Sequence, residues 1–334
     1  MAETMEDTIM DTADIEQETP PDAVFMAPSI HTSDVLIGRS YAHYSPIPSL
    51  ISADMSTACV LGVDEAGRGP VLGPMVYGLL YLPLPLHTSL LASTHHFDDS
   101  KVLTPQVRSA LMRTLCTPAT DLHASCGWAA KVMSARDIAA GMLRPAGAYN
   151  LNAQAMDATI ELIKGVLAQG VNVAEIYIDT IGSPAVYQRK LERIFPMVQI
   201  TVAKKADSLY PCVSAASVCA KVTRDAALEV CAEAVVGAGG EGGWGSGYPS
   251  DARCSGWLKR SMDPVFGWGS ETRFSWGTAK ELLETKSAPL RVEWPVEGEE
   301  DATKMTDFFA GRDEEGEGDE LSNWYGRRVT EEVF

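Results

Sequence analysis

The sequence lacks the features that would direct it to a membrane, a secretory route or an oxidising compartment. No apolar run approaches the roughly 20 residues that a membrane-spanning helix needs, and residues 1–21 are acidic and polar, unlike a signal peptide. The seven cysteines include no CxxC pair, and several lie inside apolar runs. We therefore expect an intracellular, soluble protein with no membrane contact and with free, buried thiols.

The chain also lacks an excess of positive charge, since its formal net charge is -18. The negative charge lies at the two ends. Residues 1–58 hold 1 basic and 10 acidic side chains and residues 287–334 hold 5 and 14, so that totals of 27 and 45 leave 21 of each for residues 59–286. The neutral centre leaves room for a local basic surface that contacts phosphate. The acidic ends fit solubility, or a role in opposing non-specific binding to DNA.

Composition divides the 334 residues into four segments. Residues 1–57 are expected to form an acidic, mostly disordered arm, although two short apolar stretches in it could dock on the core. Residues 58–236 are expected to form the main domain, and residues 237–290 a small helical part that follows a glycine-rich link and completes the substrate site. Residues 291–334 form a second acidic tail, for which we expect a contact with another protein of a complex.

Periodic patterns predict a mixed sheet flanked by helices. After a first strand that begins at residue 58, we expect strands over residues 75–82, 124–134, 173–179 and 198–203. We expect helices over residues 105–115, 151–168, 184–195, 211–234, 252–262 and 278–284. Thr104 should cap the first helix, with Pro105 in its first turn. Three hairpin-like strands followed by alternating helix and strand predict an α/β fold with five strands.

Acidic side chains stand where several predicted strands end. Asp64 and Glu65 follow an apolar strand, Asp179 ends another, and Asp207 stands just ahead of a long helix. Neighbouring side chains on a regular strand point to opposite faces, so we expect the chain to turn at Asp64 and Glu65. Four such carboxylates would repel one another unless a cation neutralised them, which predicts a divalent metal site. The alternative for the first pair alone is a glycine turn with a surface ion pair between Glu65 and Arg68.

Seven strings occur in one order along the chain: DEAGRGPVLGPMV from Asp64, DDSK from Asp98, YNLN from Tyr149, YIDTIG from Tyr177, KKADSLYPCVSAASVCAKVTRD from Lys204, GSGYPSD from Gly245 and RFSWGTA from Arg273. Together they resemble the type 2 ribonucleases H, and the last resembles the eukaryotic catalytic subunit in particular. The resemblance covers roughly residues 58–290 and is specific because long strings recur in order, whereas one motif would be weak evidence. It implies a ribonuclease-H-like mixed five-stranded sheet flanked by helices, plus a small helical C-terminal part.

The resemblance implies an endonuclease that hydrolyses the RNA strand of RNA/DNA hybrids and cuts 5′ of single ribonucleotides in duplex DNA, for ribonucleotide removal in DNA replication and repair. It gives the catalytic and metal-binding roles to Asp64, Glu65, Asp179 and Asp207. These would hold two Mg²⁺ ions, with Mn²⁺ as a substitute, one activating water and one stabilising the leaving 3′ oxygen. Products would carry 3′-hydroxyl and 5′-phosphate ends. None of the six histidines lies in a matched string, which disfavours a histidine base.

The resemblance also implies how the ribose is sensed. Only the 2′-hydroxyl separates RNA from DNA at one nucleotide. Backbone groups of Gly67, Arg68 and Gly69 would approach it, because glycine has no side chain. Tyr248 would pack on the adjacent nucleotide and sense the same hydroxyl, or alternatively would anchor the C-terminal helices.

Two basic residues match positions expected near substrate phosphates, namely Lys101 and Arg224. The alternative for Lys101 is a surface lysine. The alternative for Arg224 is an ion pair on its own helix, with Asp225 or Glu229.

The eukaryotic resemblance implies a nuclear heterotrimer with two non-catalytic subunits, here called B and C. In the tail, Met305, Phe308 and Phe309 have the spacing of a sliding-clamp-binding motif, but Ala302 stands where glutamine is expected. Contact with one of the other two subunits is the alternative for these residues, and also for the aromatic pair WY at 324–325.

Two rival functions share the same fold. One is a non-catalytic module that binds hybrids, against which the presence of all four carboxylates argues. The other is a different metal-dependent nuclease, such as a resolvase-like enzyme, which would cut a DNA-only substrate as fast as one that contains a ribonucleotide.

Overall fold

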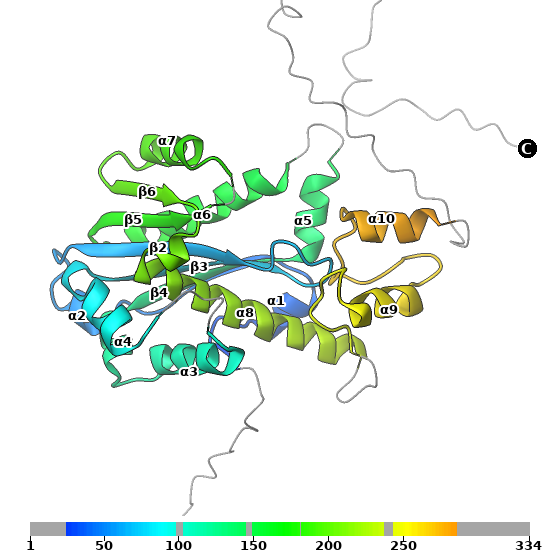
Figure 1. Ribbon diagram of the computed structural model, residues 1–334, viewed down its shortest axis with the longest axis horizontal. Helices are drawn as coiled ribbons and strands as arrows, with labels where there is room; N and C mark the ends of the chain where they lie inside the picture. The colour runs from blue at the N-terminus through cyan, green and yellow to red at the C-terminus, as the bar shows by residue number, and fades with distance from the viewer. Residues whose placement is uncertain (1–24, 98–102, 145–148, 181, 237–242, 286–334) are drawn as a thin grey trace, which may run out of the picture. The chain divides into compact units, whose positions relative to one another are not determined.

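The computed structural model describes residues 25–97, 103–144, 149–180, 182–236 and 243–285 (Figure 1). Lys101 lies outside these ranges, and so do Met305, Phe308, Phe309 and the aromatic pair at 324–325. The strands are β1 Tyr41–Tyr44, β2 Cys59–Ala66, β3 Met75–Pro83, β4 Gly127–Met133, β5 Val173–Asp179 and β6 Gln199–Ala203. The α-helices are α1 Thr32–Leu36, α2 Ser49–Ser52, α3 Pro105–Cys116, α4 Asp121–Ser125, α5 Ala135–Met142, α6 Leu151–Ala168, α7 Pro184–Ile194, α8 Pro211–Val236, α9 Ala252–Ser261 and α10 Gly277–Glu284. Three short helical turns are η1 Leu84–Leu86, η2 Ser89–Thr94 and η3 Ala206–Ser208.

The strands form one mixed sheet in the order β1-β4-β3-β2-β5-β6. The pairs β1/β4, β4/β3 and β3/β2 are antiparallel, whereas β2/β5 and β5/β6 are parallel. The predicted α/β class and mixed sheet are therefore confirmed, but the sheet has six strands instead of five. The three parallel strands bring their carboxyl ends to one edge of the sheet.

The additional strand comes from the segment that we expected to be mostly disordered. β1 pairs with β4 from Tyr41↔Val132 to Tyr44↔Ala129, and Ile51 of α2 has no exposed surface. The prediction of disorder is thus wrong for residues 25–57, because the two apolar stretches dock and a strand completes the sheet edge. The domain boundaries at residues 58 and 237 stay predictions.

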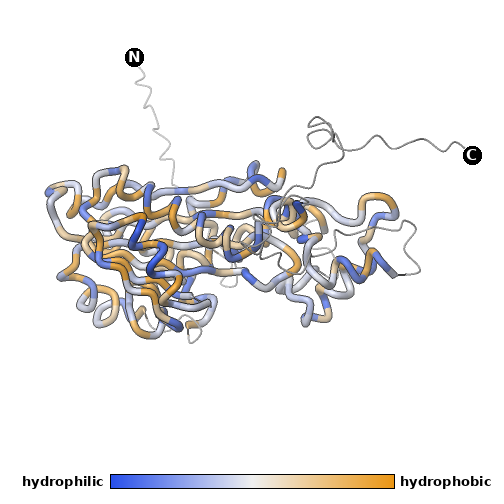
Figure 2. Tube along the Cα trace, turned by 90° about the horizontal axis from the view of Figure 1, so that it is seen from above, coloured by the Kyte–Doolittle hydropathy of each residue, from blue (hydrophilic) through white to orange (hydrophobic). Residues whose placement is uncertain are grey.

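Helices cover both faces of the sheet (Figure 1). α8 packs on one face, and α6 and α7 lie on the other, where they contribute to a second buried cluster. Glycine lets α8 approach the strands closely. A β-carbon on Gly62 would lie 2.3 Å from the carbonyl oxygen of Cys212, and one on Gly78 would lie 2.3 Å from that of Ala216. Figure 2 shows hydrophobic positions concentrated along the closely spaced segments in the left part of the view.

Most predicted boundaries agree with the structure to within one or two residues, and the start of β4 differs by three. α6 and β5 have the predicted bounds, and Thr104 Oγ1 accepts a hydrogen bond from Val107 N at 3.3 Å as the cap of α3. β4 is shorter than predicted, because Thr120 caps a separate helix, α4, over the residues just before it.

All seven cysteines are free, and six of them are buried. In the part of the chain that the structure describes, no helix has the length and apolar character of a membrane span. The prediction of buried, free thiols is therefore confirmed for six of the seven, and Cys116 is partly exposed.

Candidate active site

Asp64 and Glu65 lie within β2, which does not turn where we expected. The strand runs on to Ala66, which pairs with Val76 of β3, and the turn begins at Gly67. The expected turn at the two carboxylates is therefore wrong. The backbone hydrogen bonds to β3 keep the strand regular, so Asp64 and Glu65 project to opposite faces.

Both carboxylates still lie at one end of the sheet, where the neighbouring strand β5 also ends. The last parallel pair is Val63↔Ile178, and β5 itself ends at Asp179. Asp64 comes directly after Val63 and Asp179 directly after Ile178, so the two carboxylates follow the last pair of residues that β2 and β5 share. This end of β2 lies beyond the β5 pairing, which leaves space beside it.

Asp207 reaches the same edge through a short turn after β6. Asp179 Oδ1 accepts a hydrogen bond from Ala206 N at 2.8 Å, which ties the end of β5 to the turn η3 that carries Asp207. Lys205 enters this turn in the left-handed conformation, with φ of 58°. Asp207 is buried, with 5% of its surface exposed. The structure therefore places the four carboxylates that the sequence singled out at the same end of the sheet, and their joint role in holding a metal stays a prediction.

The carboxylates influence one another electrostatically. Burial raises the pKa of Asp64 to about 8, with a further contribution from the charge of Glu65, while the nearby Ser217 hydroxyl of α8 lowers it. Burial likewise raises the pKa of Glu65 to about 7. The charge of Arg68 lowers that value, and the charges of Asp179 and Asp207 raise it. Concentrated negative charge of this kind would be relieved by a cation.

The donor set fits a hard divalent cation such as Mg²⁺ or Mn²⁺, because it consists of carboxylate oxygens. Among the described residues, no three histidine, cysteine, aspartate or glutamate side chains stand in a geometry that could hold a metal ion directly. Repulsion between the buried carboxylates opposes their convergence, and a divalent cation would offset it. The side chains would therefore have to move closer together on binding.

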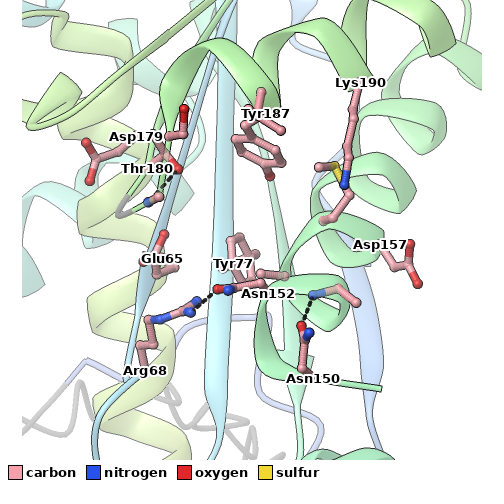
Figure 3. Close-up of a pocket in the computed structure, with 16 residues that line it drawn as sticks. Glu65, Arg68, Tyr77, Asn150, Asn152, Asp157, Asp179, Thr180, Tyr187 and Lys190 are labelled. Atoms are coloured by element: carbon pink, nitrogen blue, oxygen red, sulfur yellow. Dashed lines mark hydrogen bonds between the residues drawn. The ribbon is translucent and has the colours of Figure 1, made fainter. Parts of the chain in front are cut away.

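A cavity of about 550 Å³ opens beside Glu65 and Asp179 (Figure 3). Its other walls come from β3, α6 and α7 and include Tyr77, Asn150, Asn152, Met156, Asp157, Ser183, Val186, Tyr187 and Lys190. Arg68 extends into it and donates a hydrogen bond to Asn152 Oδ1. Sequence reasoning gave no role to Asn152 or Lys190. The string YNLN was the only signal that pointed to Asn152.

The glycine turn after β2 needs its glycines for conformation and for space. Gly67 has φ of 76°, and a β-carbon there would lie 2.7 Å from Pro74 O. A β-carbon on Gly69 would lie 3.2 Å from Cε1 of Tyr248. The turn and Tyr248, which we predicted to sense one hydroxyl together, are therefore in contact.

Tyr248 is held at this position by its own loop. Asp251 N donates to Tyr248 O at 3.0 Å, and the Asp251 carboxylate accepts from Ser246 N at 2.9 Å and from Arg253 N at 2.9 Å. The hydrogen bonds from Ser246 N and Arg253 N to the carboxylate lower the pKa of Asp251 well below its ordinary value. The side chain of Tyr248 remains available, since the residue is 42% exposed.

Arg224 lies beside the glycine turn, where a β-carbon on Gly67 would be 3.0 Å from its Cγ. Only 8% of its surface is exposed, and its guanidinium donates to Ser246 O at 2.7 Å and to Asp225 Oδ1 at 3.0 Å. The alternative of an ion pair with Asp225 is thus present, and the same side chain supports the loop that carries Tyr248. The contact with phosphate that we predicted for Arg224 stays a prediction.

Solved structures share this arrangement of strands and helices. The ribonuclease H2 from Pyrococcus horikoshii OT3 matches with a TM-score of 0.55 and 27% identity, over 68% of this chain and 97% of that one. The ribonuclease HII from Archaeoglobus fulgidus, solved in a complex with PCNA, matches with a TM-score of 0.54 and 26% identity, over 69% and 100%. A mixed sheet of this order with acidic side chains at one edge defines a nuclease of the ribonuclease-H-like fold.

Sequence comparison gives the family. The profile described as Ribonuclease HII matches residues 61–279. The A subunit of ribonuclease H2 from Neurospora crassa is 57% identical over 96% of this chain and 100% of its own, and that from Schizosaccharomyces pombe is 44% identical over 88% and 87%. The human protein of the same name is 42% identical over 79% and 85%. The chain belongs to the ribonuclease HII family and is a ribonuclease H.

Proposed function

We propose that this enzyme hydrolyses the RNA strand of RNA/DNA hybrids and cuts 5′ of single ribonucleotides embedded in duplex DNA. The observation that carries the proposal is the meeting, at one edge of the sheet, of four carboxylates with the glycine turn and Tyr248. The first group suits phosphodiester hydrolysis, and the second suits recognition of a ribose. Relatives named as the A subunit of ribonuclease H2 support the same substrate class.

Asp64, Glu65, Asp179 and Asp207 would hold two Mg²⁺ ions, or Mn²⁺ in their place. When bound, such ions supply a hydroxide nucleophile from water and stabilise the leaving 3′ oxygen. With the ions bound, the four carboxylates would surround the scissile phosphate, and the attacking and leaving oxygens would lie in line. The products would then carry 3′-hydroxyl and 5′-phosphate ends.

Selection of the ribonucleotide falls to the turn and to Tyr248. The 2′-hydroxyl is both a donor and an acceptor, and the backbone of Gly67, Arg68 and Gly69 can approach it without steric hindrance. The exposed ring of Tyr248 contacts this turn and is suited to stacking on the sugar of the next nucleotide. Lys101 is proposed to contact phosphate, as its position in the string DDSK suggests.

We also propose that the chain acts in the nucleus as part of a heterotrimer with two non-catalytic subunits, B and C. The relatives are named as A subunits, which supports a complex with several subunits. The solved complex of the Archaeoglobus relative with PCNA makes a clamp contact through Met305, Phe308 and Phe309 worth testing, despite Ala302.

The direct test is cleavage of a duplex with one ribonucleotide, with and without B and C subunits, by the wild type and by Asp64→Asn. Loss of a metal ligand should lower kcat/KM by about a hundredfold or more. Asp157→Asn is the matched control, because Asp157 lines the same cavity but lies outside the group of four. Cleavage that is unaffected by Asp64→Asn would refute the assignment.

Two substrate controls separate the rival functions. A hybrid-binding module would bind the duplex without nicking it in the presence of Mg²⁺. A resolvase-like nuclease would cut a DNA-only duplex as fast as the duplex that contains a ribonucleotide. The proposal requires nicking that depends both on the metal and on the ribonucleotide.

A further inference from the structure

Arg273 lies beneath the glycine turn with no exposed surface. Its guanidinium donates three hydrogen bonds to backbone carbonyls. Nη2 donates to Gly67 O at 2.6 Å, Nη1 to Arg68 O at 2.8 Å and Nε to Gly73 O at 3.1 Å. A planar guanidinium offers donors in a fixed fork, so these bonds define the orientation of several peptides at once.

Trp276, three residues after Arg273, also donates a hydrogen bond to the glycine turn. Its Nε1 donates to Gly69 O at 3.0 Å, and the Arg273 guanidinium lies 4.8 Å from the centroid of its ring. The carbonyl oxygens of three consecutive residues, 67 to 69, therefore all accept hydrogen bonds from two side chains of the string RFSW. We refer to Arg273 and Trp276 together as the brace.

The brace also determines where the amide groups of the turn point. In a trans peptide the C=O of one residue and the N–H of the next point in opposite directions. With the carbonyls of Gly67 and Arg68 directed at Arg273, the N–H groups of Arg68 and Gly69 point away from it. Pro70 follows and contributes no N–H. The turn thus presents two outward donors on the side away from the brace.

We propose that Arg273 and Trp276 are positioning residues that set the preference for a ribonucleotide over a deoxyribonucleotide. Arg273 acts from a fully buried position, by holding the carbonyls back so that two amide donors stay in place for the 2′-hydroxyl oxygen. This inference rests on the proposed function, in which the turn senses that hydroxyl. Arg273 and Trp276 of the string RFSW would then contribute to substrate specificity as well as to the fold.

The test compares two tryptophan substitutions that remove the same kind of hydrogen bond. Trp276→Phe removes the donor to Gly69 O and keeps an aromatic ring beside Arg273. Trp268→Phe is the matched control, because Trp268 Nε1 donates to Leu258 O at 2.9 Å within the C-terminal part. Both are made in an Asp64→Asn background, so that the duplexes are not cut during the measurement.

The readout is the ratio of affinities for a duplex with one ribonucleotide and for the same all-DNA duplex, by fluorescence anisotropy with Mg²⁺. Loss of one hydrogen bond that orients the turn should lower this ratio about three- to tenfold. Trp268→Phe should leave it unchanged. A merely structural role would lower the active fraction and weaken binding to both duplexes equally, so the ratio would not move.

Further variants complete the design. Arg273→Lys, which keeps the charge but loses the fork, should give a ratio between those of the wild type and Arg273→Met. In otherwise wild-type protein, Trp276→Phe should lower kcat/KM for the single-ribonucleotide duplex while its melting temperature matches that of Trp268→Phe.

Failure of the proposed function and failure of the role of Arg273 and Trp276 give different results. If Asp64→Asn alone binds both duplexes equally, the proposed function fails and the inference fails with it. If Asp64→Asn discriminates and the added Trp276→Phe leaves the ratio unchanged, the inference alone is overturned.

Discussion

The ring of Tyr248 lies directly against the backbone of Gly69, so that a β-carbon at position 69 would be 3.2 Å from Cε1 of the ring. The two residues are far apart in the sequence, and each belongs to a different matched string. Their contact joins the glycine turn after β2 to the loop before α9. The proposed recognition of ribose depends on this junction.

The contact predicts that substitutions at the two positions are coupled. Gly69→Ala should lower kcat/KM for a single-ribonucleotide duplex about tenfold, because the ring must shift to make room. In a Tyr248→Ala background the same change should have a smaller effect, since the crowded ring is gone. Steady-state kinetics of the four proteins measure the coupling. Strictly additive effects would contradict the contact as a functional one.

The close approach of α8 to the sheet predicts a stability effect. Gly78→Ala would place a β-carbon 2.3 Å from Ala216 O, which is backbone and cannot swing aside. We expect a loss of about 3 kcal/mol or more in the free energy of unfolding. Gly277→Ala is the control, because its β-carbon would meet nothing within 4 Å. Urea denaturation compares them, and equal stabilities would contradict the packing.

The raised pKa values predict how stability depends on pH without metal. Burial raises the pKa of Asp64 to about 8 and that of Glu65 to about 7, from ordinary values of 3.8 and 4.5. The folded state therefore binds more protons than the unfolded state between these values, and the free energy of unfolding falls as pH rises through this window. This contribution is fully present below about pH 4 and is lost as pH rises through 7 and 8.

Melting curves in EDTA should thus show a lower melting temperature at pH 8 than at pH 6. Mg²⁺ should raise the melting temperature more at pH 8, because it competes with fewer bound protons. The double variant Asp64→Asn/Glu65→Gln isolates the contribution of these groups and should flatten both effects. Stabilisation by Mg²⁺ that is equal at the two pH values would argue against the carboxylates as its ligands.

The buried position of Arg224 predicts a structural phenotype. Arg224→Met should lower the free energy of unfolding by about 1.5 to 3 kcal/mol, because Ser246 O loses a charged donor. It should leave the salt dependence of duplex binding unchanged. Arg68→Met is the comparison, since Arg68 lines the cavity and its loss should reduce the salt slope by about one counterion. A weaker salt dependence of duplex binding for Arg224→Met would instead support a contact between Arg224 and phosphate.

Local signals in the sequence were sufficient for much of the fold. Thr104 and Pro105 define the start of α3, and the amphipathic pattern of residues 151–168 defines α6. β1 was not predicted, because its four residues are stabilised by pairing with β4 and carry little strand signal of their own. The turn expected at Asp64 was wrong for a similar reason, since pairing with β3 keeps β2 extended.

The acidic part of the site was accessible from sequence because each of its strand ends carries a carboxylate in a matched string. The contacts that support the site could not be predicted from the sequence. Nothing local indicates that Arg273 reaches the carbonyls of a turn some 200 residues earlier, or that Arg224 turns inward to Ser246. Such contacts depend on tertiary packing, which brings together segments that are distant in the chain.

Crystals grown with Mn²⁺ and a cleaved single-ribonucleotide duplex would test the central claim most directly, through anomalous diffraction. The account predicts two manganese peaks, each with oxygen ligands from Asp64, Glu65, Asp179 or Asp207 and from the phosphate at the cut. Manganese bound away from these four side chains, or no anomalous peak at this edge of the sheet, would contradict it.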